Sequence, residues 1–396
     1  MRSRLHVLTV ISVVSTALVM PIACGGGGGE TPPPNTTTTV TKTTVDPTPT
    51  ATTTASSTAE TPPAPKMTMA EMQKKNVLGN MAAFNAHDAK KLASYYSADA
   101  AVRAPGMAQE AWREMKGREG IEKAHEGLFK GVPDVKTAAS RVLLSGDVAI
   151  VEWTSSGTDT VGMGGAKPTG KAVGFKAVSI QWFDKDGLIK QEHAYYDAGT
   201  IAGQLGMLPK GMKVRPVAAM PSGEPMWLES KGDDAEKKNI EAVKAFYGTF
   251  AKGDEKGFLG MLDEKASHSD YAMPEDVTGK DAAKKEFQMG HKAFPDMAFA
   301  VEGGWAAGDT VVLESTMSGT NKGAMPPFIP KATNKAVTTH GAEVLQLKDG
   351  KLLHGDTYAN SVEMVSQLGL MPPKGDAPKD AGKDAGKKPD ATPPKK

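Results

Sequence analysis

Residues 146–159 read GDVAIVEWTSSGTD, and residues 308–321 read GDTVVLESTMSGTN. Each stretch opens with a Gly-Asp turn signal, continues as a run rich in β-branched residues and ends at a Gly-Thr pair. Their offset is 308 − 146 = 162 residues. A similarity of this length at a domain-sized spacing indicates a duplicated domain and not a short-period solenoid.

Further matched segments extend the repeat on both sides of this strand. VPDV at residue 132 matches FPDM at residue 294, and PTGKAV at residue 168 matches ATNKAV at residue 332. The endings HAYYDAGTIAGQLGMLP (193–209) and DTYANSVEMVSQLGLMP (356–372) match as well. The near-constant spacing makes chance similarity a poor explanation, so the chain carries one domain twice.

Each copy shows the same order of local patterns. Apolar residues recur at intervals of three and four over 69–96 and 235–262, which predicts a first helical segment. A short strand and a second helix follow, and then strand-like runs separated by turn sequences such as PTGK and DKDG. The pattern predicts an α+β fold with helices on one face of a curved, mainly antiparallel sheet. The predicted domains are 67–210 and 236–373, with a linker at 211–235.

The N-terminus is typical of an exported protein. Arg2 and Arg4 precede an apolar run from Leu5 to Met20, and PIAC ends at Cys24. This segment predicts a signal peptide, and its end is similar to a bacterial lipobox in which Cys24 is acylated. Ordinary secretion with an unmodified Cys24 is the alternative. We therefore expect a lipid-anchored protein of the bacterial cell envelope, at the outer membrane or periplasmic face.

Two segments have compositions that do not support a packed core. Residues 25–66 consist mostly of Gly, Thr, Pro and Ala, and residues 374–396 are rich in Lys, Asp, Pro and Gly. Both are predicted to be solvated, the first as a tether and the second as a tail. The formal net charge is +1, with 47 basic and 46 acidic residues, so no nucleic-acid surface is expected.

The first copy contains an ordered series of short motifs: VPD, GD, EWT, SGT, PTGK, DKDG, YYD and QLG. This series resembles the SnoaL-like polyketide cyclases (ester cyclases) of the nuclear transport factor 2-like superfamily. The resemblance covers both copies. It implies two tandem cone-shaped domains, each enclosing an apolar pocket for a carbonyl-containing small molecule. It also implies acid–base chemistry by a carboxylate without a metal or other cofactor, and pairing of the two domains through their sheets.

The family's acid–base Asp lies at the end of the last strand, a position matched here by Asp197 in the first copy and by Asn360 in the second. An amide cannot serve as a base, so chemistry is expected in domain 1 only. Strand alternation places His193, Tyr195 and Asp197 on one face with Ile189, which is predicted to form the pocket wall. Asp197 and His193 are therefore the predicted catalytic residues. The alternative is that Asp197 caps the following helix.

Other polar residues extend this predicted site. Neither copy keeps the His that often follows Gly-Thr in the family; the first has Asp159, a second carboxylate or an ordinary turn residue. The second copy carries polar side chains that indicate a pocket lining or a hydrogen-bonded strand face. Combined with His268 these residues show no recognised metal-ligand spacing, so no metal is expected. The predicted substrate-binding residues are Tyr195, Asp159, Trp153, His340, Asp356, Tyr358 and Asn360.

Three functions are compatible with these patterns. The first is a cofactor-independent cyclase, isomerase or hydrolase acting in domain 1, with domain 2 non-catalytic. The second is a lipoprotein that holds a small apolar molecule without changing it. The third is a pair of scaffold domains that contact other proteins.

Overall fold

The computed structural model describes residues 67–106, 111–162, 167–208 and 212–371. The predicted signal peptide, Cys24, the tether and the C-terminal tail lie outside these residues. All described residues belong to one compact unit. Within them, no helix has the length and apolarity needed to cross a membrane.

Domain 1 combines four helices with a sheet. Its helices are α1 (Met69–Asn85), α2 (Ala89–Ala93), α3 (Gly117–Gly131) and α4 (Ala198–Leu205). Its strands are β1 (Tyr96–Pro105), β2 (Trp112–Lys116), β3 (Lys136–Ser145), β4 (Val148–Thr158), β5 (Ala172–Phe183) and β6 (Ile189–Tyr195). A further strand, β7 (Met226–Glu229), comes from the predicted linker and pairs in parallel with β3.

Domain 2 repeats this order of elements. Its helices are α5 (Asp234–Ala251), α6 (Glu255–Gly260), α7 (Lys280–Ala293) and α8 (Ser361–Leu368). Its strands are β8 (Leu262–Asp270), β9 (Val277–Thr278), β10 (Ala298–Ala307), β11 (Thr310–Thr320), β12 (Ala336–Lys348) and β13 (Lys351–Ala359). The strand orders are β2-β1-β6-β5-β4-β3-β7 and β10-β11-β12-β13-β8-β9, mainly antiparallel. Two tandem α+β domains are therefore present, as the repeat predicts.

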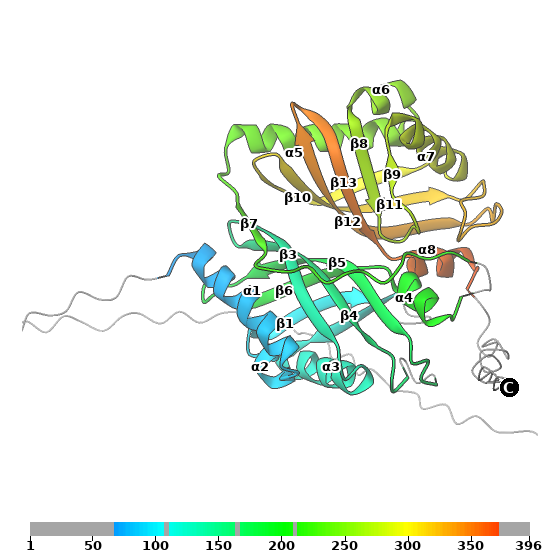
Figure 1. The fold of residues 1–396 in the computed structure, drawn as a ribbon. Coiled ribbons are helices and arrows are strands. Elements are labelled where there is room, and N and C mark those ends of the chain that lie inside the picture. Colours follow the sequence, from blue (N-terminus) through cyan, green and yellow to red (C-terminus); the bar gives the residue numbers. More distant parts are fainter. Residues whose placement is uncertain (1–66, 107–110, 163–166, 209–211, 372–396) are drawn as a thin grey trace, which may run out of the picture. The chain divides into compact units, whose positions relative to one another are not determined.

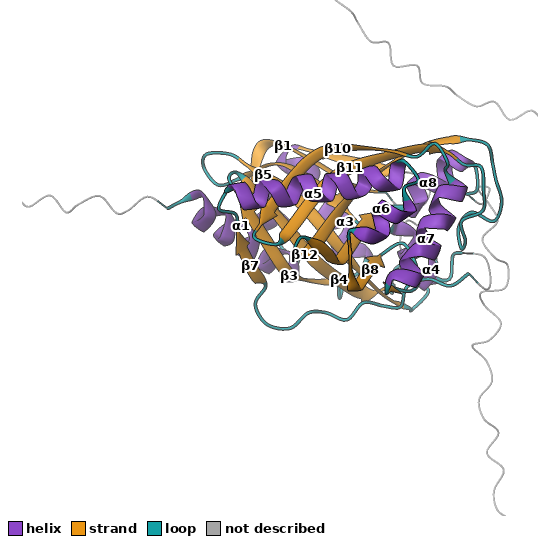
Figure 2. Ribbon diagram, turned by 90° about the horizontal axis from the view of Figure 1, so that it is seen from above, coloured by secondary structure: helices purple, strands orange, loops and turns teal. Residues whose placement is uncertain are grey.

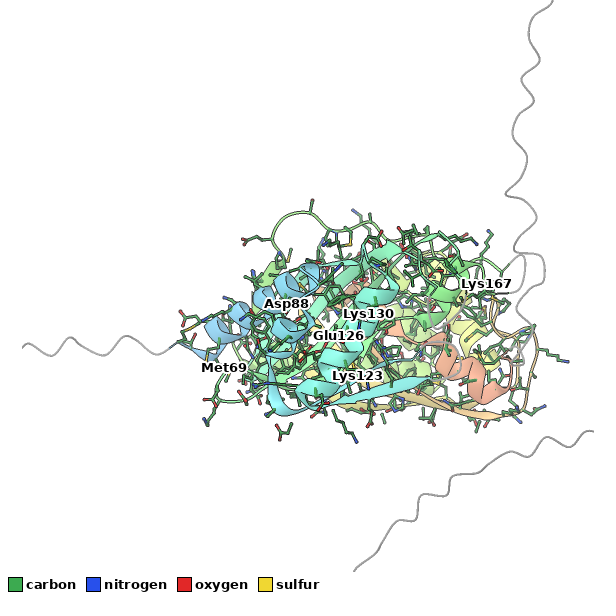
Figure 3. The ribbon with its side chains drawn as sticks, turned by 90° about the horizontal axis from the view of Figure 1, so that it is seen from below. Met69, Asp88, Lys123, Glu126, Lys130 and Lys167 are labelled. Carbon is green, nitrogen blue, oxygen red and sulfur yellow. The ribbon has the colours of Figure 1, made fainter. Side chains whose placement is uncertain are left out.

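Helices cover one face of each sheet. In domain 1, α1 packs on β3 and α3 packs on β1; in domain 2, α5 packs on β10 and β11, and α7 on β8 (Figures 1 and 2). The outer face of α3 carries Lys123, Glu126 and Lys130, which Figure 3 shows on the helix away from the sheet. This polar outer face and apolar inner face are the amphipathic pattern of a surface helix.

Each long helical segment predicted from the sequence is divided into two helices. A turn at His87, which has a positive φ of 57°, separates α1 from α2, and Gly253 with φ 68° separates α5 from α6. In both cases the second helix is capped by an aspartate side chain, Asp88 or Asp254. The Asp cap and the residue with positive φ therefore end one helix and begin the next, although apolar residues continue to recur at intervals of three and four.

A β-bulge in the last strand of each domain changes which face its side chains occupy. In domain 1, Trp182 pairs with Gln191 but Phe183 pairs with Ile189, so Lys190 is an extra residue. Ile189 consequently belongs to the core of domain 1, whereas Tyr195 belongs to a different cluster. The prediction that Ile189 shares a face with His193 and Tyr195 is wrong, because strict alternation does not continue through a bulge.

The two sheets share a hydrophobic cluster. It contains Ile150, Ile180 and Tyr195 from domain 1 together with Val344 and Tyr358 from domain 2. The remaining core residues of each domain lie between its own sheet and helices. Each sheet therefore buries both faces, one against helices and one in the shared cluster.

Candidate functional site

The interior of domain 2 contains a cavity of about 280 Å³, which we call the chamber. Its walls come from α5, α6, α7, α8 and the inner face of the sheet. A wider depression of about 740 Å³ shares Asp270, Met273, Glu286 and Met289 with the chamber and also includes linker residue Met212. The shared residues show that this depression adjoins the chamber.

Three substitutions between the repeats explain why the chamber exists in domain 2. In domain 1 the rings of Trp153, Phe175 and Tyr196 contact one another, with centroids 4.8–6.3 Å apart. Strand register makes these positions equivalent to smaller residues of domain 2, all of which line the chamber: Ser315, Thr339 and Ala359. An aromatic cluster thus fills the first copy where the second is hollow.

The same comparison reveals a set of polar residues that domain 1 lacks. These polar residues all line the chamber: His268 and Asp270 on β8, Glu286 on α7, Glu343 on β12 and Thr357 on β13. Their equivalents in domain 1 are Val102, Ala104, Ala124, Ser179 and Ala194. Ionisable groups inside a domain cost free energy unless they are paired or used. This particular set occurs only in the hollow copy and lines its cavity, which indicates a functional site.

His268 is held in its protonated form by its neighbours. Its Nδ1 lies 3.1 Å from Oε1 of Glu286, and its Nε2 lies 2.9 Å from Oγ1 of Thr357. Burial favours the neutral ring, but the hydrogen bond and charge of Glu286, with the charges of Asp270 and Asp356, raise the pKa of His268 to about 9. His268 and Glu286 therefore form an ion pair at neutral pH.

Asp270 and Glu343 have pKa values displaced by different amounts. Burial raises the pKa of Asp270 to about 6, with His268 and the Ala272 N–H acting against it. Burial also raises the pKa of Glu343 to about 8, reinforced by Asp270 and Glu314 and opposed by Ser315 and His268. Near pH 7, Asp270 is mainly ionised and Glu343 is mainly protonated. One carboxyl can accept a proton while the other donates a hydrogen bond.

Asp197 lies at the N-terminus of α4 and is 1 % exposed. Its carboxylate accepts hydrogen bonds from the backbone of Gly199 and Thr200 and, across the two domains, from the N–H and Oγ of Ser361. It does not line the chamber of domain 2. It does line a separate cavity of about 430 Å³ with Lys176 and Arg215. This is the helix-capping arrangement; the catalytic role of Asp197 remains a prediction.

His193 and Tyr195 contact domain 2 and not the interior of domain 1. Nδ1 of His193 and the hydroxyl of Tyr195 each lie 2.6 Å from Oε1 of Glu314. The interior position on β6 belongs instead to Glu192, which accepts a hydrogen bond from Tyr96. Burial favours a neutral Glu314, but His193, Tyr195 and Arg103 together lower its pKa.

Tyr358 and Asp356 form the reciprocal contact from domain 2. The hydroxyl of Tyr358 donates to Glu152, the repeat equivalent of Glu314, at 2.7 Å. Arg141 pairs with Glu152 and lies 3.4 Å from Asp356. Asp356 also accepts a hydrogen bond from Tyr271 at 2.6 Å. Tyr195 and Tyr358, which are equivalent in the two repeats, therefore join the domains, and Asp356 additionally lines the chamber.

The remaining predicted binding residues have separate environments. Trp153 donates to Ser179 inside domain 1, and Asp159 holds the β4–β5 loop through Gly162 and Thr169. His340 pairs with Glu363, and Asn360 caps α8; both line the chamber. Ligand contact by any of these residues remains a prediction. Within the described residues, no group of three or more His, Cys, Asp or Glu is arranged to hold a metal ion.

A family model for the SnoaL-like domain matches residues 78–192 and 243–354, which together make up more than half of the chain. The chain belongs to the SnoaL-like family. Both copies are matched, so the SnoaL-like domain is present in tandem, and the structure has the nuclear transport factor 2-like α+β fold in each. No curated protein matches the chain.

Solved structures of similar fold each align with about one third of this SnoaL-like chain. A candidate SnoaL-like polyketide cyclase from Jannaschia sp. CCS1 has 16% identity and a TM-score of 0.33, covering 36% of this chain and 99% of its own. An LEH-like epoxide hydrolase of M. tuberculosis has 15% identity and a TM-score of 0.29, covering 34% of this chain and 92% of its own. A nuclear transport factor 2-like protein from Burkholderia xenovorans LB400 has 15% identity and a TM-score of 0.29, covering 34% of this chain and 99% of its own.

Proposed function

We propose that domain 2 binds a small, largely apolar molecule bearing a carbonyl group and transfers a proton on it. The observation that carries this proposal is the divergence of the two repeats. The second copy has smaller residues where the first has three core aromatic side chains, and it has four ionisable side chains where the first has non-ionisable residues. A filled domain needs neither difference for stability, whereas a binding chamber needs both.

In this proposal Asp270 is the base and Glu343 the hydrogen-bond donor. Asp270 removes a proton from the carbon beside the carbonyl, and the protonated Glu343 donates to the carbonyl oxygen as negative charge develops there. The protonated His268 ring places a positive charge near the same carboxyl groups, and Glu286 balances this charge. The resulting enolate can be reprotonated, or it can attack a second carbonyl and close a ring.

Exchange of the α-proton for deuterium tests this function without knowledge of the product. A panel of β-keto esters is incubated in D₂O with the purified chain lacking residues 1–24, and exchange is followed by NMR. We expect exchange to rise as pH increases through about 6, when Asp270 ionises, and to fall through about 8, when Glu343 ionises.

Three variants assign the site. Asp270→Asn is expected to lower the exchange rate by about a hundredfold or more, and Glu343→Gln by a smaller factor, because an amide still donates a hydrogen bond. Asp197→Asn is expected to leave the exchange rate unchanged. Loss of exchange in Asp197→Asn alone would place the chemistry in domain 1. Binding of a panel member without exchange would indicate a binding protein.

We also propose export and acylation at Cys24, with residues 25–66 as the tether. The support is the sequence of residues 1–24. Incorporation of a radiolabelled fatty acid in a bacterial host, compared with Cys24→Ala, tests this proposal. Equal labelling of both proteins would contradict it.

A further inference from the structure

Two carboxyl groups in the chamber lack a basic partner. Glu286 pairs with His268, and Asp356 pairs with Arg141 and His354. Asp270 and Glu343 differ from these. Among the hydrogen bonds and ion pairs of the described residues, the carboxylate of Asp270 accepts a hydrogen bond only from the Ala272 N–H, and that of Glu343 accepts only from the Ser315 hydroxyl, at 3.3 Å.

Glu343 is the more deeply buried of these two groups, at 6 % exposure, and it lines the chamber. A buried carboxyl without a charged partner is costly to ionise, and a second carboxyl in the same cavity adds repulsion. A ligand that brings a positive charge would remove both costs. A ligand that brings a negative charge would increase them.

The apolar part of the chamber is dominated by aromatic rings. Phe246 and Phe258 stack with centroids 4.9 Å apart, and Phe250 lies 5.7 Å from Phe258. Tyr247 and Phe299, whose ring centroids lie 5.1 Å apart, also line the cavity. The faces of aromatic rings carry negative charge density and attract cations, including quaternary ammonium groups. The aromatic walls therefore favour the same sign of ligand charge as the carboxyl groups.

We propose that the ligand of the domain 2 chamber is a small organic cation, a protonated or quaternary amine with an apolar body. The inference concerns the site of the proposed function and rests on that site being a ligand chamber. It is compatible with the proposed proton transfer, because an ammonium group beside a carbonyl withdraws electrons from the carbon between them. That carbon is then more acidic, and a weaker base such as Asp270 suffices.

Cation binding should depend on pH through the two unpaired carboxyl groups. The charged groups acting on them are His268 on the same strand as Asp270, Glu286 on α7, Glu314 on β11 and Asp197 at the N-terminus of α4 in domain 1. Arg215 of the linker donates to the backbone carbonyl of Asp270. Protons compete with the cation for Asp270 below about pH 6 and for Glu343 below about pH 8. The affinity should therefore increase from pH 5 to pH 8.5.

Titration calorimetry with a matched pair of ligands tests the charge. Cyclohexylmethylamine and cyclohexylmethanol have nearly the same shape, and the amine stays protonated throughout pH 5–8.5. We expect the amine to bind the purified chain lacking residues 1–24 about tenfold or more tightly than the alcohol at pH 8. Choline and 3,3-dimethylbutan-1-ol form a second pair that tests a quaternary ammonium group.

Variants distinguish the effect of the Asp270 charge on ligand binding from effects on folding and on the proposed chemistry. Asp270→Asn is nearly isosteric and is expected to remove most of the preference for the amine, whereas the exposed Glu114→Gln in domain 1 should preserve it. The pH dependence of the unaltered protein provides the same answer if Asp270→Asn does not fold. Equal or tighter binding of the neutral member in both pairs would overturn the cation proposal while leaving the chamber function intact. Failure of both cations to bind would overturn the cation proposal as well.

Discussion

Trp153 of domain 1 and Ser315 of domain 2 occupy the same position of the same strand, but they have opposite roles in their domains. Trp153 packs against Phe175 and Tyr196 and donates to the hydroxyl of Ser179. Ser315 lines the chamber and donates to Glu343, which is the equivalent of Ser179. The two repeats have thus diverged at one contact from a packed core into a polar cavity wall.

Replacement of Trp153 with Ala should therefore affect stability and not ligand binding. Removal of a large core ring leaves a cavity that typically costs about 3–5 kcal/mol in the free energy of unfolding. Chemical denaturation measures this cost, and titration of the chamber with cyclohexylmethylamine measures binding. Loss of amine affinity in a folded Trp153→Ala protein would show that domain 1 contains part of the ligand site.

Glu343→Gln should stabilise the protein at alkaline pH. Because burial raises the folded-state pKa of Glu343 from 4.5 to about 8, its protonated form contributes stability that is fully present below pH 4.5. This contribution is lost as pH rises through about 8, at roughly 1.4 kcal/mol per pH unit. Chemical denaturation at pH 5 and pH 8.5 should show that the free energy of unfolding of the variant, relative to that of the unaltered protein, is greater at the higher pH. A constant difference at both pH values would contradict burial of this carboxyl.

Arg141→Met should destabilise the contact between the domains. Arg141 is the cation that Glu152 and Asp356 share, and all three side chains are largely buried. Removal of one member of a buried ion pair leaves an uncompensated charge and typically costs about 3–5 kcal/mol. The control is Lys130→Met on the exposed face of α3, which should change the free energy of unfolding by less than about 1 kcal/mol. Equal effects of the two substitutions would refute this account of the domain contact.

Asp197→Asn separates the capping role from the catalytic role predicted from the sequence. The carboxylate accepts from Thr200 and Ser361, and an amide can accept at only one of its two terminal atoms. We expect a loss of about 1–2 kcal/mol in the free energy of unfolding, with deuterium exchange unchanged. Unchanged stability together with loss of exchange would support the catalytic role instead.

Much of the fold could be predicted from the sequence because the repeat constrains it twice. Turn signals, β-branched runs and the QLG endings occur in both copies, so each copy supports the interpretation of the other. The same alignment also contained the signal for the chamber. Trp153 aligns with Ser315 in the two matched strands, and a small residue at an interior position where the other copy has a large one predicts space. The contrast is visible only when the two copies are compared at this position, because Trp153 considered alone is an ordinary core residue.

The orientation of the last strand could not be predicted from alternation. The extra residue Lys190 turns His193 and Tyr195 toward domain 2, and no local pattern in the sequence marks a bulge at that point. A different reason applies to the polar residues of the chamber, His268, Asp270, Glu286 and Glu343. They come from three strands and a helix, and only the tertiary fold brings them to one cavity. Nothing in their sequence spacing connects them.

The central claim is that domain 2 is hollow and domain 1 is filled. Xenon occupies apolar space inside proteins, and the aromatic wall of the chamber provides such space, so a crystal pressurised with xenon reports on both interiors in one experiment. We predict xenon in the chamber beside Phe250 and Phe258, and none among Trp153, Phe175 and Tyr196. Xenon within the aromatic cluster of domain 1, with the domain 2 chamber empty, would contradict the account.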